Sequence, residues 1–372
     1  MKIESIDYQL SRLPLPKGTW GDQIHVVTHI EILTATLRTD TGVVGYGFSH
    51  TSGVGGITMM AMLKELTPTL IGKEVAATPL WHASWKYLRD NGPGGTTTLA
   101  LAAVDIAVWD ALSKQAGVSL GTYLGKVRDR VQLYGSGINL NLSAEEVVEQ
   151  VRGWKAEGYF AAKVKVGKPD LEEDVERLTK IREAVGMYPL MVDANQGWTY
   201  AEAVRATERF RHLGLYWVEE PLRVDDVIGH ARLRARSGIP IGLGENVYTL
   251  QQFNQYLASD AVDFIQADIG RVGGITPYLD IAALGRAYVA PMAPHFIVEL
   301  SAHVLCSVPN ALAGEMTDGG TMTELGAILP QPPQNGYFVP RDVPGHGLEF
   351  NWDYLNASRV EADAQPLTHA EV

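Results

Sequence analysis

Apolar and polar positions alternate over the first 50 residues in three short segments. Ile3 and Tyr8 lie in the first, and the others cover 29–37 and 42–47. Such alternation is typical of strands with one buried face, and the turn at 40–42 predicts an antiparallel meander. Apolar residues then recur at helical spacing within about 56–72 and 97–117. These segments predict a separate α+β unit.

From about residue 131 the pattern becomes a repeat of strand and helix. The predicted strands cover 131–134, 161–166, 190–194, 216–219, 239–244, 264–268, 289–294 and 311–315, with helical patterns between most of them. Eight strands with helical crossovers are typical of a parallel α/β barrel. A doubly wound sheet is the alternative, but it would not need eight evenly spaced strands.

The repeat stops after about residue 330, where a Pro-rich irregular segment begins. We expect the tail to pack back on the first unit. The predicted division is therefore a unit formed by 1–128 together with 336–372, and a barrel formed by 129–335.

Composition and charge narrow the class of protein. Hydrophobic residues make up 46% of the 372 positions, and the formal net charge is -12. An acidic chain without basic patches argues against nucleic acid and anionic membranes as partners. The N-terminal segment lacks the apolar stretch of a signal peptide, and the single Cys306 excludes an intrachain disulfide framework. We expect a cytoplasmic protein.

Three carboxylates each end a predicted apolar strand. Asp193, Glu219 and Glu245 follow one another at intervals of 26 residues. A carboxylate at the tip of a buried strand is unfavourable unless something pairs with it. For each one alone, a helix cap or a loop ion pair is the ordinary explanation. At one common spacing they predict a shared hard divalent cation with oxygen ligands, of which Mg²⁺ is the usual one.

Two lysines lie two positions apart on the strand predicted at 161–166. Strand geometry places Lys163 and Lys165 on one face and Ala162 and Val164 on the other. The alternative is an exposed strand with solvated lysines. In a barrel both ammonium groups would face the lumen, where each would lower the pKa of the other toward that of a base. Asn195 has the same two-residue relation to Asp193, and its amide could bind a substrate hydroxyl or carboxylate.

Two adjacent predicted strands end in Asp268 and His295. A carboxylate that holds one imidazole nitrogen fixes the tautomer and raises the basicity of the other nitrogen. A lone histidine would instead be read as a satisfied core residue. Glu315 ends the last predicted strand, where a neutral carboxyl could donate a hydrogen bond to a substrate anion. A loop salt bridge is the alternative for Glu315.

This set of residues suits one difficult step, removal of the proton α to a carboxylate. A metal, Lys163 and Glu315 would stabilise the charge that develops, while Lys165 and His295 would serve opposite faces of the carbon. Return of a proton to the same carbon gives racemisation or epimerisation. Protonation of a departing β-hydroxyl by His295 gives dehydration.

The chain resembles the mandelate racemase branch of the enolase superfamily over nearly its whole length. The resemblance rests on 163–165, 192–195, 218–221, 244–246, Asp268 with 272–276, 294–296 and Glu315. It implies an α+β N-terminal capping domain on a (β/α)₇β TIM-like barrel. It also implies one Mg²⁺, or Mn²⁺, on Asp193, Glu219 and Glu245.

The resemblance further implies a role for each remaining site residue. The bases would be Lys165 and His295, with Asp268 beside the latter. Lys163 and Asn195 would bind substrate, and Glu315 would be the electrophilic carboxyl. The family often forms oligomers, so we also expect a homo-oligomer.

Substrate preference in the family lies in two cap loops, here about 15–28 and 50–56. Their candidate contacts are Lys17, Trp20, His25 and His50. The mixed polarity of the first loop favours a polyol over an aryl substrate. The second loop has no Lys or Arg, so only Lys17 could bind a second carboxylate.

The sequence therefore predicts a lyase that dehydrates an acid sugar, an aldonate or aldarate, to a 2-keto-3-deoxy acid. The second hypothesis is a racemase or epimerase of a 2-hydroxy acid. A non-catalytic barrel that binds a metal and an acid is a more remote one.

Overall fold

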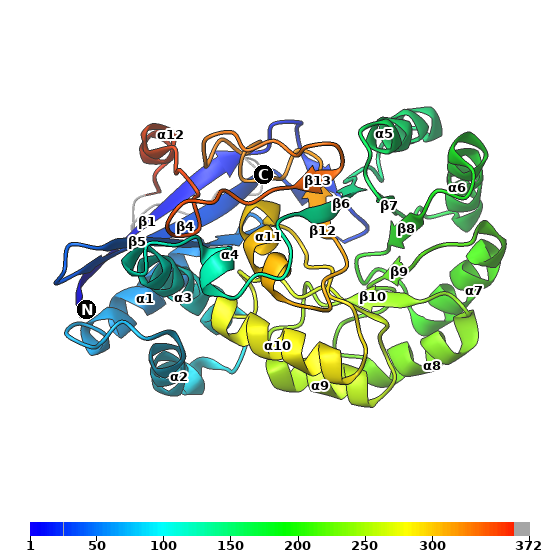
Figure 1. Ribbon diagram of the computed structural model, residues 1–372. Helices are drawn as coiled ribbons and strands as arrows, with labels where there is room; N and C mark the ends of the chain where they lie inside the picture. Colours follow the sequence, from blue (N-terminus) through cyan, green and yellow to red (C-terminus); the bar gives the residue numbers. More distant parts are fainter. Residues whose placement is uncertain (25, 361–372) are drawn as a thin grey trace.

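The computed structural model describes residues 1–24 and 26–360, and Figure 1 shows their arrangement. A curved antiparallel sheet with its helices lies on one side of the molecule, and a ring of parallel strands surrounded by helices lies on the other. This confirms the predicted TIM-like barrel with an N-terminal α+β cap.

The cap sheet has the order β1-β4-β5 and is antiparallel throughout. Its strands are β1 (Ile3–Pro14), β4 (His29–Thr39) and β5 (Val44–Thr51). The short strands β2 (Trp20–Gly21) and β3 (Val26–Val27) pair within the first predicted specificity loop. The alternation over residues 1–50 therefore predicted the meander correctly.

Helices cover one face of the cap sheet. They are α1 (Gly56–Leu66), α2 (Ala77–Leu88) and α3 (Thr96–Gln115), and the short helices Thr67–Thr69 and Arg89–Asn91 follow α1 and α2. The sequence pattern missed α2 because its buried face is small and includes Ser84. By length and composition α3 could cross a membrane, but most of it is buried inside the cap.

Glycines on β5 allow α3 to lie directly on the sheet. A Cβ atom added to Gly47 would lie 2.1 Å from the carbonyl oxygen of Ala103, and one added to Gly45 would lie 2.1 Å from that of Ala107. A side chain at either position would push the helix away. The close packing of α3 against β5 therefore depends on these two glycines.

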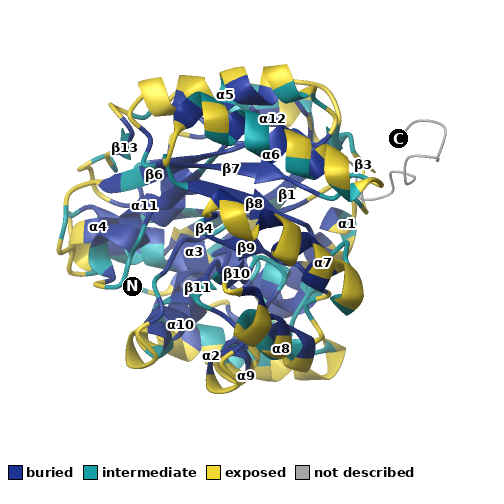
Figure 2. Cartoon of the chain, turned by 90° about the vertical axis from the view of Figure 1, so that its right-hand side faces the viewer, coloured by how far each residue is buried: buried dark blue, intermediate teal, exposed yellow. Residues whose placement is uncertain are grey.

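Seven parallel strands form most of the barrel ring, in the order β11-β10-β9-β8-β7-β6-β12. They are β6 (Val131–Ser136), β7 (Ala161–Lys165), β8 (Leu190–Asp193), β9 (Val218–Glu219), β10 (Ile241–Leu243), β11 (Phe264–Ile265) and β12 (Gly314–Thr317). The helices between them bury their inner faces on the strands and expose their outer faces (Figure 2). They are α5 (Ala144–Ala156), α6 (Leu171–Val185), α7 (Tyr200–Phe210), Arg211–Leu213, α8 (Val227–Ser237), α9 (Leu250–Ala258), α10 (Ile275–Ala287) and α11 (Val298–Ser307), with α4 (Leu120–Tyr123) preceding β6.

The strand predicted at 289–294 is wrong as a strand, because only Met292 pairs there. Met292 makes single parallel bridges to Ile265 and Ala311, and these bridges close the ring between β11 and β12. Pro291 and Pro294 flank it and have no N–H group to extend a ladder. Ring closure therefore survives although the seventh strand is reduced to one residue.

Residues after the Pro-rich segment contact both parts of the molecule. The strand β13 (Tyr337–Phe338) pairs with β6 of the barrel, whereas α12 (Trp352–Ala357) lies against β1 of the cap. Ser11 Oγ donates a hydrogen bond to the carbonyl of Leu355, and Val360 N donates one to that of Leu10. Residues 361–372 of the predicted packing segment lie outside the described residues. The boundaries at 128/129 and 335/336 stay predictions.

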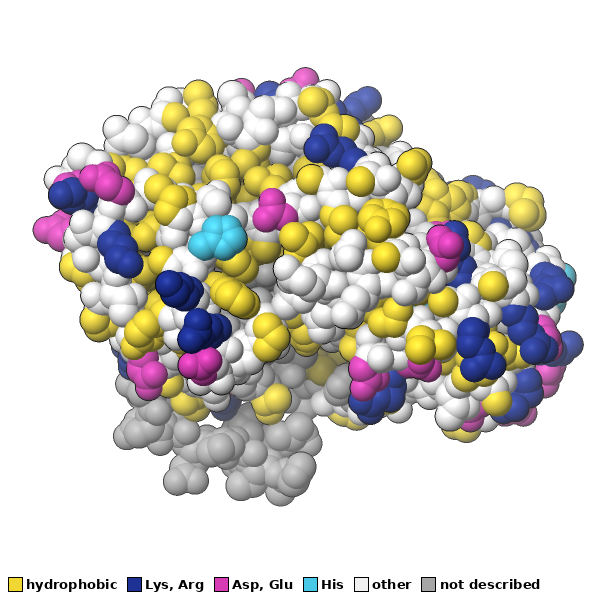
Figure 3. All heavy atoms as spheres, turned by 90° about the horizontal axis from the view of Figure 1, so that it is seen from below, with side chains coloured by type: hydrophobic (Ala, Val, Ile, Leu, Met, Phe, Trp, Pro, Cys, Tyr) yellow, Lys and Arg dark blue, Asp and Glu magenta, His cyan; other side chains and the backbone are white. Residues whose placement is uncertain are grey.

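Surface charge of both signs is interspersed over the face drawn in Figure 3. Lys and Arg side chains there alternate with Asp and Glu side chains. Ion pairs on the surface of the described residues include Arg209 with Glu172 and Arg236 with Glu208.

Candidate active site

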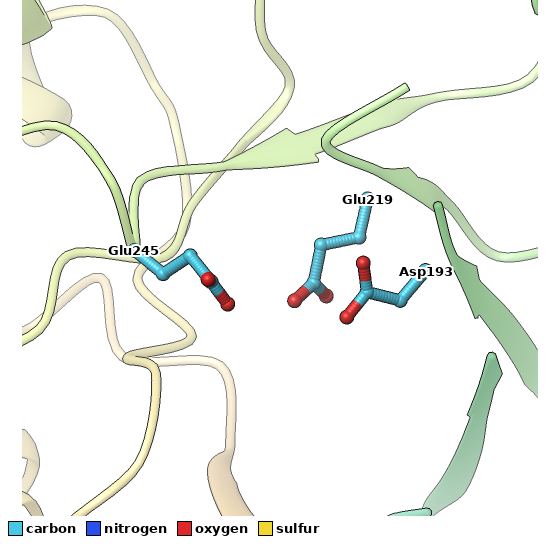
Figure 4. Close-up of side chains that lie close together, drawn as sticks. All are labelled: Asp193, Glu219 and Glu245. Atoms are coloured by element: carbon cyan, nitrogen blue, oxygen red, sulfur yellow. The ribbon is translucent and has the colours of Figure 1, made fainter. Parts of the chain in front are cut away.

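Three carboxylates meet at the carboxyl ends of neighbouring strands. Asp193 and Glu219 are the last residues of β8 and β9, and Glu245 lies two residues after β10. Parallel pairing of Asp193 with Glu219 and of Glu219 with Gly242 brings the strand ends to one level. One oxygen from each carboxylate lies within 4.8 Å of the others, and Figure 4 shows the three side chains converging.

The protein surroundings neutralise this cluster incompletely. Burial raises the pKa of Glu219 to about 7, against the lowering effect of Lys163. Burial would also raise the pKa of Glu245, but His295 and Arg271 outweigh it and lower that pKa to about 2. Two adjacent carboxylates thus have very different proton affinities, which indicates unbalanced negative charge.

The donor set fits a hard divalent cation. Carboxylate oxygens are the preferred ligands of Mg²⁺, and a cation between them would remove the repulsion among Asp193, Glu219 and Glu245. Glu219 Oε2 also accepts hydrogen bonds from Trp217 Nε1 and Gln266 Nε2, which fix the orientation of its carboxylate. Supporting hydrogen bonds of this kind are typical of metal ligands.

Lys163 and Lys165 project from β7 into the same cluster. Lys163 Nζ lies 2.5 Å from Glu219 Oε1 and 2.7 Å from Glu315 Oε1. Lys165 Nζ lies 2.6 Å from Asp193 Oδ2. Both ammonium groups are almost completely buried, so the alternative of a solvated strand is wrong.

The expected lowering of the lysine pKa values is not seen in this arrangement. Burial would lower the pKa of Lys165, but Asp193 outweighs burial and the net shift is a rise. Burial acts in the same direction on Lys163, where Glu219 and Glu315 raise the pKa well above its ordinary value. The expectation relied on the neighbouring lysine together with a nearby metal ion. Among the side chains alone, the carboxylates across the barrel mouth have the larger effect.

Asp268 and His295 form a hydrogen-bonded pair on the other side of the carboxylate cluster. His295 Nδ1 lies 2.7 Å from Asp268 Oδ2, and His295 Nε2 lies 3.2 Å from Glu245 Oε2. The second oxygen of Asp268 accepts hydrogen bonds from the backbone N–H groups of Gly270 and Arg271. These contacts fix both the carboxylate and the imidazole ring that it holds.

The local electrostatics favour a protonated His295. Burial would lower its pKa, but Glu245 and the hydrogen bond with Asp268 outweigh burial and raise it. Burial would raise the pKa of Asp268, but nearby His50 and His295 lower it. The pair therefore has the charge distribution of imidazolium and carboxylate.

A strained turn places His295 at this point. Phe296 and Ile297 follow it with φ angles of 55° and 44°, in the left-handed region that β-branched residues avoid. Phe296 N donates a hydrogen bond of 2.7 Å to Glu315 Oε2, which ties the turn to β12. Backbone strain of this kind is concentrated at functional sites in proteins.

Glu315 is ionised in this arrangement, contrary to the expectation of a neutral carboxyl. Burial would raise its pKa, but Lys163 and His295 outweigh burial and lower it to about 2. The expectation was for Glu315 beside a substrate anion, which would drive the carboxyl toward its neutral form. The ammonium of Lys163, which lies directly beside Glu315, acts in the opposite direction.

Asn195 lies beside Asp193 with its amide available. Its backbone N–H donates to Asp193 Oδ1, and its φ of 44° turns the chain at the end of β8. Its side-chain Oδ1 is buried and has no hydrogen-bond partner among the described residues. This placement is compatible with the predicted role in substrate binding.

The predicted cap-loop residues lie in different environments. Trp20 lines the cavity and makes an edge contact with the ring of Phe296. Lys17 does not line it, because its ammonium is paired with Asp318 at 2.5 Å and its side chain is 58% exposed. The structure therefore does not bring Lys17 into the site. His25 lies outside the described residues.

His50 extends from β5 of the cap to the barrel mouth. Its ring stacks obliquely on Phe296, and its Nε2 lies 3.6 Å from Asp268 Oδ2. Burial lowers its pKa to about 4, against the raising effect of Asp268. His50 is thus a neutral side chain that packs against the Asp268–His295 pair and lines the cavity, and its ring nitrogens are buried without a hydrogen-bond partner among the described residues.

Arg271 is a site residue that the sequence analysis missed. Its buried guanidinium donates to Asn246 Oδ1 and to the carbonyl of Glu245, and it lies 3.7 Å from Asp268 Oδ2. It therefore links the loop after β10 to the loop after β11. The sequence could have indicated this role, because Arg271 is a basic residue only three positions after Asp268.

These side chains surround one cavity of about 340 Å³ between cap and barrel. Its floor is polar and comes from the barrel strand ends, namely Lys163, Lys165, Asn195, Glu245, Arg271, His295 and Glu315. Its upper wall comes largely from the cap and includes Trp20, Ile24, Val27, Val54 and Leu99. A volume of this size suits a small-molecule ligand.

Comparison with known proteins establishes the class. Residues 21–125 match the N-terminal domain of the mandelate racemase / muconate lactonizing enzyme family, and residues 146–354 match the enolase C-terminal domain-like family. The chain belongs to the mandelate racemase / muconate lactonizing enzyme family of the enolase superfamily.

Its similar proteins include enzymes of two reaction types. The chain is 33% identical to 3,6-anhydro-alpha-L-galactonate cycloisomerase of Streptomyces coelicolor over 363 residues, covering 96% of this chain and 99% of that one. It is 35% identical to L-talarate/galactarate dehydratase of Salmonella typhimurium over 321 residues, covering 83% and 79%.

Solved structures share the whole fold. A racemase from Streptomyces coelicolor A3(2) with bound magnesium superposes with a TM-score of 0.91 at 33% identity, covering 96% of this chain and all of that one. An L-talarate dehydratase from Polaromonas sp. JS666, complexed with Mg and L-glucarate, superposes with a TM-score of 0.87 at 32% identity, covering 97% and 98%.

Proposed function

We propose that this protein is a Mg²⁺-dependent lyase that dehydrates an acid sugar to a 2-keto-3-deoxy acid. One observation carries the proposal. Lys165 and the Asp268–His295 pair lie on opposite sides of a three-carboxylate cluster, and both Lys165 and His295 line one cavity between cap and barrel. The relatives that are named dehydratases of talarate, galactarate and arabinonate support the acid-sugar assignment.

Asp193, Glu219 and Glu245 would hold the metal. When bound, Mg²⁺ supplies Lewis-acid stabilisation of the negative charge that develops on the substrate carboxylate. The magnesium in similar solved structures supports this choice of ion, and Mn²⁺ has the same preference for oxygen ligands.

Lys165 is the proposed base that takes the proton from the α-carbon. Its ammonium lies against Asp193, so ligation of that carboxylate by a cation would compete with this contact. The neighbouring cation would then favour the neutral amine. Its burial keeps water away from the proton transfer.

His295 is the proposed general acid on the opposite face. Nδ1 is held by Asp268, so the proton on Nε2 faces the cavity and can pass to the departing β-hydroxyl. Loss of that hydroxyl as water completes the elimination, and the resulting enol tautomerises to the 2-keto acid. Asp268 acts through His295 as a positioning residue.

Lys163 and Asn195 would position the substrate carboxylate. The ammonium of Lys163 can donate a hydrogen bond to it while it remains paired with Glu315. The free Oδ1 of Asn195 can accept a hydrogen bond from a substrate hydroxyl.

Racemisation of a 2-hydroxy acid is the second candidate. The placement of proton-transferring groups on both sides of the cluster supports racemisation as well as dehydration. For racemisation, the group on the second face would protonate the α-carbon instead of the departing hydroxyl. Relatives named racemase or epimerase support it as well. A non-catalytic metal-binding barrel would show neither reaction.

A screen of acid sugars in the presence of Mg²⁺ tests the proposal. Semicarbazide trapping detects a 2-keto product, and NMR in D₂O detects exchange of the α-proton. A keto product supports dehydration. Exchange without keto product would support the racemase, and the absence of both with every acid would contradict an enzymatic function.

The homo-oligomeric state and the cytoplasmic location stay predictions. Light scattering behind size-exclusion chromatography would measure the first, and fractionation of cells that produce the protein would test the second.

A further inference from the structure

Every lysine and arginine that lines the cavity lies on its barrel floor. They are Lys163, Lys165 and Arg271. Lys163 and Lys165 lie next to the carboxylate cluster, where the substrate carboxylate would bind. They therefore serve the end of the substrate at which the reaction takes place.

Arg271 is already paired with groups of the barrel floor. Its guanidinium already donates to Asn246 Oδ1 at 2.7 Å and to the carbonyl of Glu245 at 3.2 Å. It also lies 3.7 Å from carboxylate oxygens of Glu245 and Asp268. Turning it toward the cap would leave two buried carboxylates without this cation.

The cap side of the cavity is uncharged or acidic, and Thr51 and Ser52 are its hydroxyl-bearing residues. The described cap residues that line it are Trp20, Asp22, Ile24, Val27, His50, Thr51, Ser52, Val54 and Leu99, and none of them is Lys or Arg. His50 is uncharged near neutral pH because its pKa is lowered by burial to about 4. This wall cannot neutralise a carboxylate.

Lys17 is the nearest cap cation in the first specificity loop, and it is bound elsewhere. Its Nζ lies 2.5 Å from Asp318 Oδ1, directly after the end of β12. Gln150 Nε2 donates to the other oxygen of Asp318, which fixes that carboxylate in place. Lys17 is therefore held outside the cavity by an ordered partner.

We infer that the site takes acid sugars with one carboxylate and an uncharged far end, and discriminates against aldarates. The inference rests on the proposed function and deepens it. A carboxylate moved from water to a largely apolar wall without a cation is unfavourable, even where a few hydroxyl groups can donate hydrogen bonds to it. A hydroxymethyl, deoxy or ring-closed end avoids this penalty and can pack against the side chains of Trp20 and Leu99.

Matched pairs of acid sugars test the inference. Gluconate and glucarate, or galactonate and galactarate, differ only in the oxidation state of the terminal carbon. Calorimetric titration into the full-length protein with Mg²⁺ measures binding, and α-proton exchange in D₂O measures the reaction. We expect the aldonate of the preferred configuration to bind about tenfold or more tightly than its aldarate and to exchange faster.

Placing a cation on the cap wall of the cavity tests the same inference in the opposite direction. Val54 lines the cavity and is 81% exposed, so Val54→Arg should fold normally and offer a cation to the far end of the substrate. We expect this variant to raise the aldarate-to-aldonate affinity ratio about tenfold. Val54→Gln, of similar length without charge, should leave the ratio within about twofold of the original protein. Leu99→Arg with Leu99→Met forms a second pair at another residue of the wall.

The outcomes separate the inference from the proposed function. Equal or tighter binding and exchange of the aldarate would overturn the inference and leave α-proton abstraction intact. If the original protein binds the aldarate and Lys17→Met does not, then Lys17 reaches the cavity. That result would also overturn the inference. Failure of every pair to bind or exchange would overturn both.

Discussion

His295 Nδ1 lies 2.7 Å from Asp268 Oδ2, and the two side chains form one hydrogen-bonded unit at the mouth of the barrel. The carboxylate is anchored by two backbone N–H groups, so it fixes the ring, whose Nε2 lies 3.2 Å from Glu245 Oε2. The orientation of the imidazole is therefore decided by a residue on the preceding strand loop.

Asp268→Asn tests this unit. An amide cannot stabilise an imidazolium as a carboxylate does, so we expect kcat to fall about 10²-fold or more while KM changes little. Steady-state kinetics on the acid sugar found in the screen measure both constants. His212→Asn, which changes an exposed histidine on the outside of the barrel, is the matched control and should retain the original kcat. A proportional change in KM would contradict a positioning role.

Lys165→Ala and His295→Asn test the division of labour between the two faces. Each variant should lose proton exchange with one configuration at the α-carbon, because each removes the group that serves one face. NMR in D₂O with both epimers of the substrate measures exchange separately from product formation. Full activity in both variants would show that the two-base arrangement is wrong.

Removal of the metal should stop turnover and lower stability together. Mg²⁺ binds only the folded carboxylate cluster, so 100-fold excess over its Kd should add about 2.7 kcal/mol to the unfolding free energy. Thermal unfolding with and without a chelator measures this change. In Glu219→Gln, which removes one ligand charge at nearly constant shape, the dependence of Tm on Mg²⁺ should be much weaker. An unaltered dependence would contradict the assignment of Glu219 as a ligand.

Asp105 makes the stability of the cap–barrel contact depend on pH. This α3 carboxylate accepts hydrogen bonds from the backbone and hydroxyl of Thr276 at the start of α10, and burial raises its pKa from 3.8 to about 7. The folded state thus binds the proton more tightly than the unfolded state. Its stabilisation is complete below about pH 4 and is lost as the pH rises toward 7, at most about 4 kcal/mol in total.

Asp105→Asn isolates that contribution. The amide mimics the neutral carboxyl, since it can accept from Thr276 N and donate to Thr276 Oγ1. We expect the difference in unfolding free energy between Asp105→Asn and the original protein to move in favour of the variant between pH 4 and 7. Urea denaturation at several pH values measures it. A pH-independent difference would contradict the raised pKa.

Gly47 and Gly153 provide a matched test of packing. Gly47→Ala should destabilise the cap by about 2 kcal/mol or more, because its Cβ would overlap the carbonyl of Ala103. Gly153→Ala places the same methyl group on an exposed position of α5 with no atom within 4 Å, and should stabilise by about 0.5–1 kcal/mol. Thermal unfolding of both variants measures the contrast. Equal effects would show that α3 can shift away from β5.

The sequence predicted most of the barrel because strand and helix periods are local properties. The predicted strands 190–194 and 239–244 contain β8 and β10, and their ends agree within two residues. The prediction of a strand at 289–294 was wrong because only Met292 pairs there, between two prolines. Its partners, Ile265 and Ala311, come from other parts of the chain. Helix α2 was missed because its buried face includes small and polar residues that gave no strong pattern.

Much of the candidate site could also be grouped from the sequence, although Arg271 was missed and Lys17 lies outside the cavity. Residues at the carboxyl ends of parallel strands meet at one barrel mouth whatever lies between them, so Asp193, Glu219, Glu245, Lys165 and His295 could be grouped from spacing. Only the tertiary structure decided their charge states and their partners. Electrostatic interaction depends on distances across the ring, such as Lys163 to Glu315 and Lys17 to Asp318, and residues more than 150 positions apart bring no local signal of such contacts.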